Sequence, residues 1–341
     1  MKRLRVLVML HPQLVPPDSL EGCSERQIDE WRVEYDVLGA LRTAGHEVRV
    51  CAVLDSLEPL DRELRNWKPH VVFNLLEEFN GVVAYEANLV AHLELMSQPY
   101  TGCNPRGLML SRDKVLSKQL LRSAGIATPQ WVVTPRGRRP SLPADLHFPL
   151  IVKSATDDAS LGIAQASVVH DLTQLRSRVR LMHEKYGCDA LIEEYIDGRE
   201  LYVGVLGNER PLALPVWELQ FGRLPKRMSR IATRRIKWDR AYQRSLGIGP
   251  RPAPGLNALQ VRRIHSVALA AWRALRLSGL ARIDFRLRED GQLFVLEANP
   301  NPNIARIEDF ATSAAAAGID YAELIRRLLR AGMTYQAAWR D

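Results

Sequence analysis

Residues 281–299 read ARIDFRLREDGQLFVLEAN, and this stretch decides the fold. Two apolar runs flank Asp290-Gly291, a dipeptide typical of a two-residue hairpin turn. The spacing therefore predicts an antiparallel hairpin, and the turn sets which residues face each other. The facing pairs are Glu289 with Gln292, Asp284 with Glu297, and Arg282 with Asn299.

The two inner pairs carry the chemistry of the hairpin, and strand alternation places them on one face. Two carboxylates directly opposite each other repel, so Asp284 and Glu297 are expected to share a cation. Their oxygens and that of Asn299 are hard ligands that suit Mg²⁺ bridged to phosphates. The alternative is a surface hairpin whose charges face water, which the otherwise apolar strands disfavour. The other face is expected to hold Ile283, Phe285, Leu296 and Ala298.

The composition is that of an ordinary globular protein. Of the 341 residues, 46% are hydrophobic and 25% charged, which excludes a disordered chain, a coiled coil and a collagen-like repeat. No apolar run approaches the roughly 18–20 residues of a membrane span, and residues 6–10 are too short an apolar run for a signal peptide. The four cysteines lie far apart, so we expect neither a disulfide framework nor a zinc site, and a reducing cytoplasm fits.

Positive charge is concentrated in residues 222–251, which contain ten Lys and Arg residues against one acid, Asp239. The net charge of the whole chain is only +8, so the remainder is close to neutral. This concentration favours a local anionic partner over a generally basic surface. Three interpretations stay open: phosphate or another anionic small molecule, a solvated loop, and nucleic acid.

Strand and helix patterns alternate through residues 3–96 and predict a parallel sheet covered on both faces. Gly and Pro residues at 102–105 mark the end of this first domain, which we place at residues 1–104.

The chain has no GxxxxGK[ST], GxGxxG, HExxH or GxSxG motif, so it is no Walker-type ATPase. Further expected elements include helices over 112–123, 172–184 and 257–277 and strands over 163–169, 190–195, 201–206 and 211–217.

The segment GLARIDFRLREDGQLFVLEAN, residues 279–299, resembles the metal-binding hairpin of ATP-grasp ligases, most closely the D-alanine–D-alanine ligase family. The resemblance runs from about residue 71 to the C-terminus. It implies a Rossmann-like N-terminal domain followed by a two-lobed ATP-grasp fold, a combination of α/β and α+β structure. The lobes would be residues 105–196 and 197–341. It also implies that Asp284, Glu297 and Asn299 hold two Mg²⁺ ions against ATP, and that Arg282 stabilises an acyl-phosphate and the oxyanion formed from it.

Four further segments resemble nucleotide-binding parts of this family, in the same order along the chain. They are SRDKVLSKQLLRSAGIATP, FPLIVK, LIEEYIDGRE and RRIKWD. Taken alone, their lysines and acids would be surface anchors and strand-edge charges. The resemblance implies phosphate contacts from Lys114, Lys153, Ser160 and Lys237, adenine contacts from Glu193, Glu194, Tyr195 and Ile196, and ribose contacts from Glu200.

The departures from the family pattern lie where substrates are selected. In the phosphate loop, Ala159 replaces a serine, although Ser160 matches the next one. Residues 73–81 replace the family's substrate segment, and Asn303 stands where a glycine completes the oxyanion hole. The glutamate segment that holds the first D-alanine is not recognisable in residues 11–25. ATP handling is thus expected to be retained, while D-alanine specificity is not.

We therefore predict an ATP-dependent carboxylate–amine ligase, with an amino acid as the carboxylate. Its selectivity would lie at Glu77, Glu78 and Asn303 and in the loop at residues 12–24. Small-molecule carboxylates and amines are the expected partners, without a membrane or nucleic acid, and a homodimer is a candidate assembly. The alternatives are transfer of the acyl group to a thiol or bicarbonate, and a non-enzymatic module that binds nucleotide or RNA.

Overall fold

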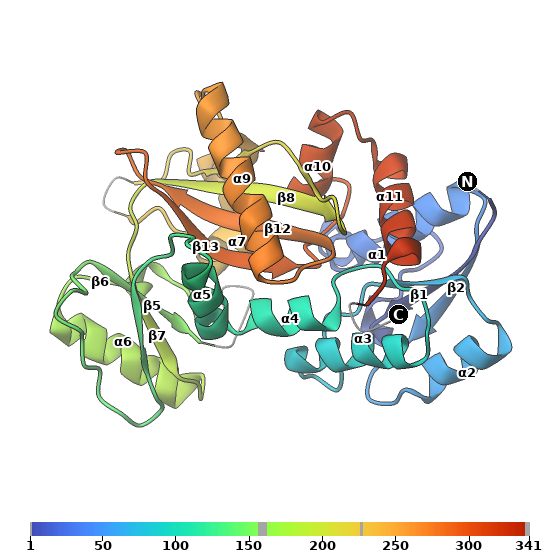
Figure 1. Cartoon of the computed structure of the whole chain (residues 1–341), viewed down its shortest axis with the longest axis horizontal. Coiled ribbons are helices and arrows are strands. Elements are labelled where there is room, and N and C mark those ends of the chain that lie inside the picture. The colour runs from blue at the N-terminus through green and yellow to red at the C-terminus, as the bar shows by residue number, and fades with distance from the viewer. Residues whose placement is uncertain (1, 156–161, 226–227, 338–341) are drawn as a thin grey trace.

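The computed structural model describes residues 2–155, 162–225 and 228–337. Three β-sheets follow one another along the chain, and helices pack on each of them (Figure 1). Within these ranges, no helix combines the length and the hydrophobicity that crossing a membrane would require.

The first sheet has three parallel strands in the order β2-β1-β3. Val8 in the central strand pairs with Val50 on one side and Phe73 on the other. Helices α1 and α11 (Tyr321–Thr334) cover one face, and α2 and α3 cover the other, which is why β1 is apolar in both directions. The elements are β1 Arg5–Leu10, η1 Pro12–Leu14, α1 Glu25–Thr43, β2 Glu47–Ala52, α2 Glu58–Asn66, β3 Val71–Asn74, η2 Val83–Tyr85 and α3 Glu86–Leu95.

The second sheet has four antiparallel strands in the order β4-β7-β5-β6. Helix α6 packs on it through Leu175, Val179 and Met182. Two helices, α4 and α5, lead into this sheet from the first domain. The elements are α4 Pro105–Arg112, α5 Lys114–Ser123, β4 Trp131–Thr134, β5 Leu150–Ser154, η3 Gln165–Ser167, β6 Val168–Val169, α6 Leu172–Lys185 and β7 Ala190–Glu194.

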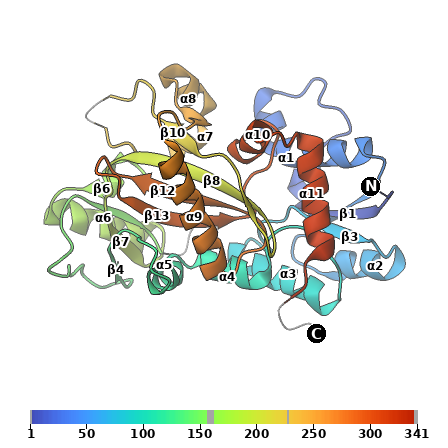
Figure 2. The same ribbon diagram turned by 45° about the horizontal axis from the view of Figure 1, so that its top comes forward.

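The third sheet is antiparallel, with the order β11-β10-β8-β12-β13 and β9 paired to β8. Figures 1 and 2 both show α9 lying across β8 and β12. The elements are β8 Arg199–Gly207, β9 Leu212–Ala213, β10 Trp217–Gln220, α7 Arg234–Trp238, α8 Arg240–Leu246, β11 Gly249–Pro252, α9 Ala258–Ala274, β12 Gly279–Leu287, β13 Leu293–Pro300 and α10 Asp309–Ala316, followed by α11.

The hydrophobic cores do not follow the order of the chain. One cluster joins Val8 and Val37 of the first domain to Phe310 and Leu328 near the C-terminus, and Figure 2 shows α11 beside α1. The C-terminal helices therefore fasten the third sheet to the first. The division at residues 104 and 196 stays a proposal, since only the sheets, and not the cores, fall within it.

Several expected elements differ in detail. The helix predicted over residues 112–123 is α5, which begins only at Lys114, because the Asp113 side chain accepts hydrogen bonds from the Val115 and Leu116 amides and caps it; Arg112 ends the preceding helix α4. The strand predicted over 211–217 is interrupted before β10, where Pro215 has no amide hydrogen to donate. Of the strand predicted over 163–169, residues 165–167 form η3 and only β6 pairs with a neighbouring strand. Helices α2, α4, α7, α8 and α10 had no clear sequence signal.

Candidate active site

The hairpin β12–β13 brings the predicted metal-site residues together. Asp284 pairs with Glu297 and Arg282 with Asn299, as the spacing predicts. Closer to the turn the register differs by one residue, because Phe285 pairs with Val295. Leu296 is thus the extra residue of a β-bulge and has no cross-strand partner, contrary to the expected alternation.

The turn of the hairpin also differs from the prediction. The Gly291 amide donates to the Arg288 carbonyl at 3.0 Å, and the Arg288 amide donates to the Gln292 carbonyl at 2.9 Å. Arg288 therefore faces Gln292, and the connection has three residues rather than two. Gly291 takes a φ of 84°, the left-handed residue that closes such a loop. The longer turn and the bulge compensate each other, which is why the inner pairs are those expected.

Arg282 lies at the centre of this face. Its Nε and Nη2 donate to the two oxygens of Asp284, at 2.7 and 2.9 Å, and its Nη1 donates to Asp309 at 3.1 Å. The guanidinium also lies 4.6 Å from the centre of the Tyr202 ring. Asn299 donates its amide hydrogen to Asp284 at 3.0 Å, which leaves the Asn299 carbonyl oxygen available as an acceptor or ligand. These contacts hold the guanidinium in one orientation.

The two facing carboxylates have opposite electrostatic environments. Burial raises the pKa of Asp284 to about 6, against the opposing effect of Arg282. Burial would also raise the pKa of Glu297, but Lys237, Lys114 and Lys153 together with Arg282 hold it at about 2. Glu297 is therefore ionised at neutral pH in a cluster of cations. Such a cluster can bind several negative charges at once.

The donor set fits a magnesium ion that is bound to phosphate rather than a metal held by protein alone. Two carboxylates and one amide oxygen come from the hairpin, and no group of three or more His, Cys, Asp or Glu side chains in the described ranges could form a cage. Mg²⁺ commonly binds through one or two carboxylates and fills its other positions with water and phosphate oxygens. Glu297 has no hydrogen-bond partner in the described part of the chain, so it is the more open ligand; Asp284 is covered by Arg282.

A buried ion triad occupies the adjoining lobe. Glu193 forms ion pairs with Lys118 at 2.9 Å and with Lys153 at 2.8 Å, and all three side chains are largely buried. Burial would raise the pKa of Glu193, but the two lysines lower it below its ordinary value. Sequence reasoning found Glu193 and Lys153 but missed Lys118. The available signal was that Lys118 lies on the buried stripe of α5 with Ser117 and Leu121.

The predicted nucleotide hinge is held by two arginines at the end of β12, Arg286 within the strand and Arg288 directly after it. Arg286 donates to Glu200 at 2.7 Å, and the Tyr202 hydroxyl donates to the other oxygen of Glu200 at 2.8 Å. Arg288 pairs with Glu194. Every second residue along this face is charged, in the order Arg282, Asp284, Arg286 and then Arg288 just after the strand. The sequence analysis assigned roles only to Arg282 and Asp284. The roles of Glu194, Tyr195, Ile196 and Glu200 toward adenine and ribose stay predictions.

The remaining predicted residues are distributed around the hairpin. Lys114 begins α5 and Lys237 lies in α7, and both are close enough to Glu297 to lower its pKa. Glu77 and Asn303 line one cavity between the first domain and the loop after β13. Glu78 does not line that cavity and lies 3.8 Å from His11. Ser160 and its neighbours in the phosphate loop, including Ala159, lie outside the described residues.

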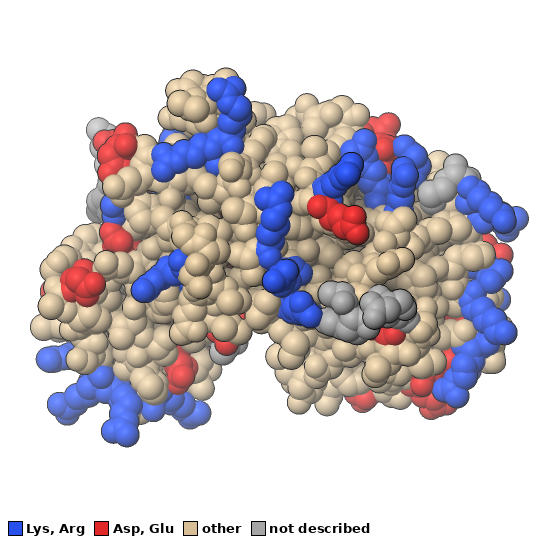
Figure 3. All heavy atoms as spheres, in the orientation of Figure 1, with Lys and Arg blue, Asp and Glu red and all other residues tan. Residues whose placement is uncertain are grey.

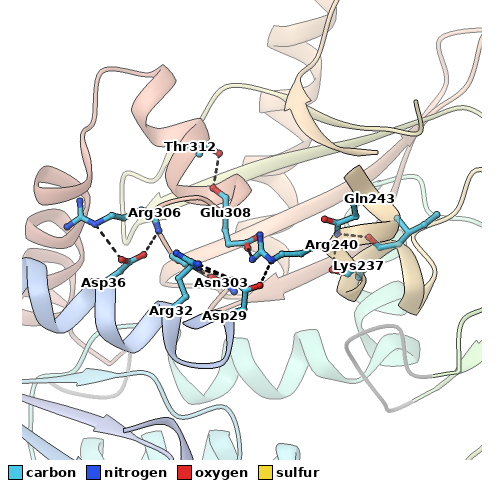
Figure 4. Close-up of polar contacts among 12 residues, drawn as sticks. Asp29, Arg32, Asp36, Lys237, Arg240, Gln243, Asn303, Arg306, Glu308 and Thr312 are labelled. Atoms are coloured by element: carbon cyan, nitrogen blue, oxygen red, sulfur yellow. Dashed lines mark hydrogen bonds and ion pairs between the residues drawn. The ribbon is translucent and has the colours of Figure 1, made fainter. Parts of the chain in front are cut away.

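The basic segment is partly tied down by ion pairs. Arg240 at the start of α8 contacts Asp29 of α1 at 2.7 Å and Glu308, which precedes α10, at 3.1 Å (Figure 4). This arrangement is not the freely solvated loop that was one of the three interpretations. Elsewhere on the face in Figure 3, Lys and Arg side chains form separate groups rather than one continuous surface.

The fold and the site together are those of an ATP-grasp enzyme. The features that indicate this class are the three sheets, the charged antiparallel hairpin and the lysines that converge on it. A crystal structure of the D-alanine–D-alanine ligase from Bacillus anthracis complexed with ATP has this fold, with a TM-score of 0.73, 22% identity and 98% coverage of both chains. The family described as D-ala D-ala ligase C-terminus matches residues 120–330, and the chain belongs to it. It is an ATP-grasp ligase related to the D-alanine–D-alanine ligases.

Individual relatives cover most of the chain. The D-alanine–D-alanine ligase of Nitratidesulfovibrio vulgaris is 32% identical over 298 residues, which are 86% of this chain and 90% of that enzyme. The Sinorhizobium fredii protein called Uncharacterized protein y4sG is 34% identical over 306 residues, which are 87% of this chain and 86% of that protein. The similarity therefore extends into the first domain, and it favours an enzyme over the non-enzymatic alternative.

Proposed function

We propose that this protein joins a carboxylate to an amine at the expense of ATP, through an acyl-phosphate. The observation that carries the proposal is the β12–β13 face, where ionised Glu297 and fixed Arg282 lie among lysines from three other elements. A cluster of this charge and geometry suits phosphoryl transfer, in which positioning and neutralisation of charge supply most of the catalysis.

The reaction has two steps. A carboxylate oxygen of the first substrate attacks the γ-phosphorus of ATP, the bond to the β-phosphate oxygen breaks, and ADP leaves. Lys114, Lys153 and Lys237 would neutralise the phosphates, and Arg282 would orient the acyl-phosphate. A neutral amine then attacks the acyl carbon, the carbon–oxygen bond to phosphate breaks, and the nitrogen loses a proton. The products are an amide, ADP and inorganic phosphate.

The metal belongs to the same proposal. Asp284, Glu297 and the carbonyl oxygen of Asn299 would hold Mg²⁺, and two ions remain the prediction. When bound, Mg²⁺ would supply charge neutralisation at the transferring phosphate. An ionised carboxylate has about four acceptor positions, so Asp284 could bind the metal while Arg282 keeps its two hydrogen bonds. The contacts of Arg282 with Asp309 and the Tyr202 ring would also keep the guanidinium in place.

The substrate is proposed to differ from that of the D-alanine–D-alanine ligases. Asn303 and Ala159 stand at positions where the resemblance implies substrate contacts of the family, and Glu77 brings a carboxylate to the cavity that Asn303 also lines. Small-molecule carboxylates and amines, including amino acids, remain the proposed partners. A cytoplasmic location and a homodimer are also proposals, and light scattering on the purified protein tests the second.

ADP release tests the proposed function. The protein is incubated with Mg·ATP and pairs drawn from the twenty L-amino acids, D-alanine, D-serine and D-glutamate. At least one pair is expected to release ADP in step with amide formation, and D-alanine alone is expected to give negligible dipeptide. Efficient coupling of two D-alanines would show that the substrate departures matter little. ADP release without any new amide would contradict the amine step.

A further inference from the structure

Tyr202 lies in the middle of the functional face of the third sheet. It belongs to β8, where its backbone pairs with that of Asp284 on β12. Strand alternation places its side chain on the same face as Glu200, two residues earlier, and only 6% of the residue is exposed. The neighbouring strand carries Arg282 and Arg286 on that face. Tyr202 is therefore a buried aromatic residue among charged side chains, which the proposed reaction does not by itself require.

The hydroxyl of Tyr202 holds the carboxylate of Glu200. It donates a hydrogen bond to Oε1 at 2.8 Å, while Arg286 donates to Oε2 at 2.7 Å. Burial, together with the charge of Glu200, raises the pKa of Tyr202 well above its ordinary value, so the hydroxyl keeps its proton and stays a donor. An ionised carboxylate has about four acceptor positions, so positions remain for a ligand. Glu200 also lines a cavity of about 280 Å³, in which a ligand with hydroxyl groups could lie.

The ring of the same side chain supports Arg282. The guanidinium carbon lies 4.6 Å from the ring centre, which is a cation–π contact. Such a contact is stronger at a buried position than at an exposed one, because water does not compete for the cation. Asp284 and Asp309 hold the same guanidinium through hydrogen bonds. Replacing the ring by an aliphatic side chain would therefore loosen Arg282 although both acids remain.

Packing fixes the Tyr202 side chain in an apolar cluster that includes part of the basic segment. The other buried members of this cluster are Leu219, Phe221, Ile236 and Ile248. Ile236 lies in α7 directly before Lys237, the predicted phosphate contact. A side chain packed in this way can hold its hydroxyl and its ring in place at the same time.

We propose that Tyr202 is a positioning residue that joins nucleotide binding to catalysis, with its hydroxyl orienting Glu200 toward the ribose and its ring orienting Arg282 toward the acyl-phosphate. This inference rests on the proposed ligase function and on the predicted ribose contact of Glu200. It gives each half of the side chain a partner of its own. Mutation separates the two halves, because phenylalanine keeps the ring and leucine keeps neither.

Nucleotide binding tests the hydroxyl without catalysis. Mg·ADP and Mg·2′,3′-dideoxy-ADP are titrated into the whole chain by calorimetry. Wild type should bind ADP about tenfold or more tightly than the dideoxy analogue, because a site that hydrogen-bonds hydroxyl groups disfavours a ligand without them. Tyr202→Phe should reduce this preference to about threefold or less, since Arg286 alone then holds Glu200.

Tyr100→Phe is the matched control for the binding experiment. The Tyr100 hydroxyl is also buried and donates to a carboxylate, that of Glu94, at 2.7 Å, but it lies in the first domain. This variant should keep the wild-type preference. Failure of wild type to bind ADP would refute the proposed function and this inference with it. ADP binding with a preference that Tyr202→Phe leaves intact would refute the inference alone.

Turnover tests the ring. With an amino-acid pair that releases ADP and with saturating ATP, Tyr202→Phe should keep kcat within about twofold of wild type, whereas Tyr202→Leu should lower it about tenfold or more. Thermal unfolding of both variants checks that they are folded, and a purely structural role would lower the unfolding temperature without this separation of kcat. Equal kcat in the two variants would overturn the role of the ring. If no pair releases ADP, the ligase proposal fails, while calorimetry still decides the role of the hydroxyl.

Discussion

The β12–β13 face and the cavity beside α1 both bury carboxylates, but they treat them in opposite ways. On the hairpin, cations from neighbouring elements surround Glu297 and hold its pKa at about 2. In the cavity, which Glu77 and Asn303 also line, burial raises the pKa of Glu34 to about 7, and the charge of Glu77 adds a smaller effect in the same direction. The first region is thus prepared to receive anions, whereas burial in the second favours the protonated, neutral form of the acid. The difference shows that neighbouring cations, and not burial alone, decide the charge of a buried carboxylate in this protein.

The largest expected effect comes from the anionic side. Glu297→Gln should reduce kcat at least about 100-fold, because the amide lacks the negative charge that balances the lysines and Mg²⁺. The far-UV circular dichroism spectrum should be unchanged. Steady-state ADP release measures the effect, and Glu289→Gln at the exposed tip of the hairpin is the control. Normal turnover in Glu297→Gln would refute the metal assignment.

The buried triad gives the next effect, this time on stability. Lys118→Met removes one of the two cations that hold Glu193, and should lower the free energy of unfolding by about 3 kcal/mol. Urea denaturation measures the change, with Lys185→Met at the end of α6 as the control. A loss below about 1 kcal/mol would mean that Lys153 alone compensates the buried carboxylate.

A smaller and opposite effect is expected in the cavity. The folded protein retains the Glu34 proton up to a pKa of about 7, whereas the unfolded chain loses it near 4.5. This residue therefore makes the wild type less stable as the pH rises from about 4.5 to 7, and the loss persists above 7. Glu34→Gln should be more stable than wild type by about 2 kcal/mol at pH 8 and nearly equal at pH 4.5. Thermal unfolding at the two pH values measures this; a gain of equal size at both would exclude ionisation as its cause.

The smallest effect concerns the contact between the basic segment and α1. Arg240 is partly exposed, so its pairs with Asp29 and Glu308 should contribute less than about 1 kcal/mol. Arg240→Ala should speed trypsin cleavage after Arg230 or Arg235 without a measurable change in global stability. We expect Mg·ATP with a substrate carboxylate to protect both forms. Protection by RNA and not by nucleotide would instead revive the nucleic-acid interpretation.

The sequence predicted the hairpin well because its pattern is local. Alternating residues and an adjacent turn determine which side chains meet, so Asp284 and Glu297 could be paired without knowing the rest of the fold. The same analysis missed Lys118, since helical lysines are usually exposed and only packing against the second sheet buries this one. Glu34 could not be recognised at all. The residues that bury it come from segments more than 200 positions away, such as Asn303 and Leu328.

The bulge at Leu296 changes what one strand can do. In a regular strand, residues two apart share a side, so Val295 and Glu297 would both turn toward the core or both toward the site. Because one residue is left unpaired between them, Val295 stays in the core opposite Phe285 while Glu297 joins Asp284 on the functional face. The one extra residue therefore lets β13 place Val295 in the core and, two positions later, Glu297 on the functional face. Deleting Leu296 would make Val295 and Glu297 neighbours, and ordinary alternation would then keep Glu297 on the functional face, so the deletion should remove the bulge without displacing the carboxylate.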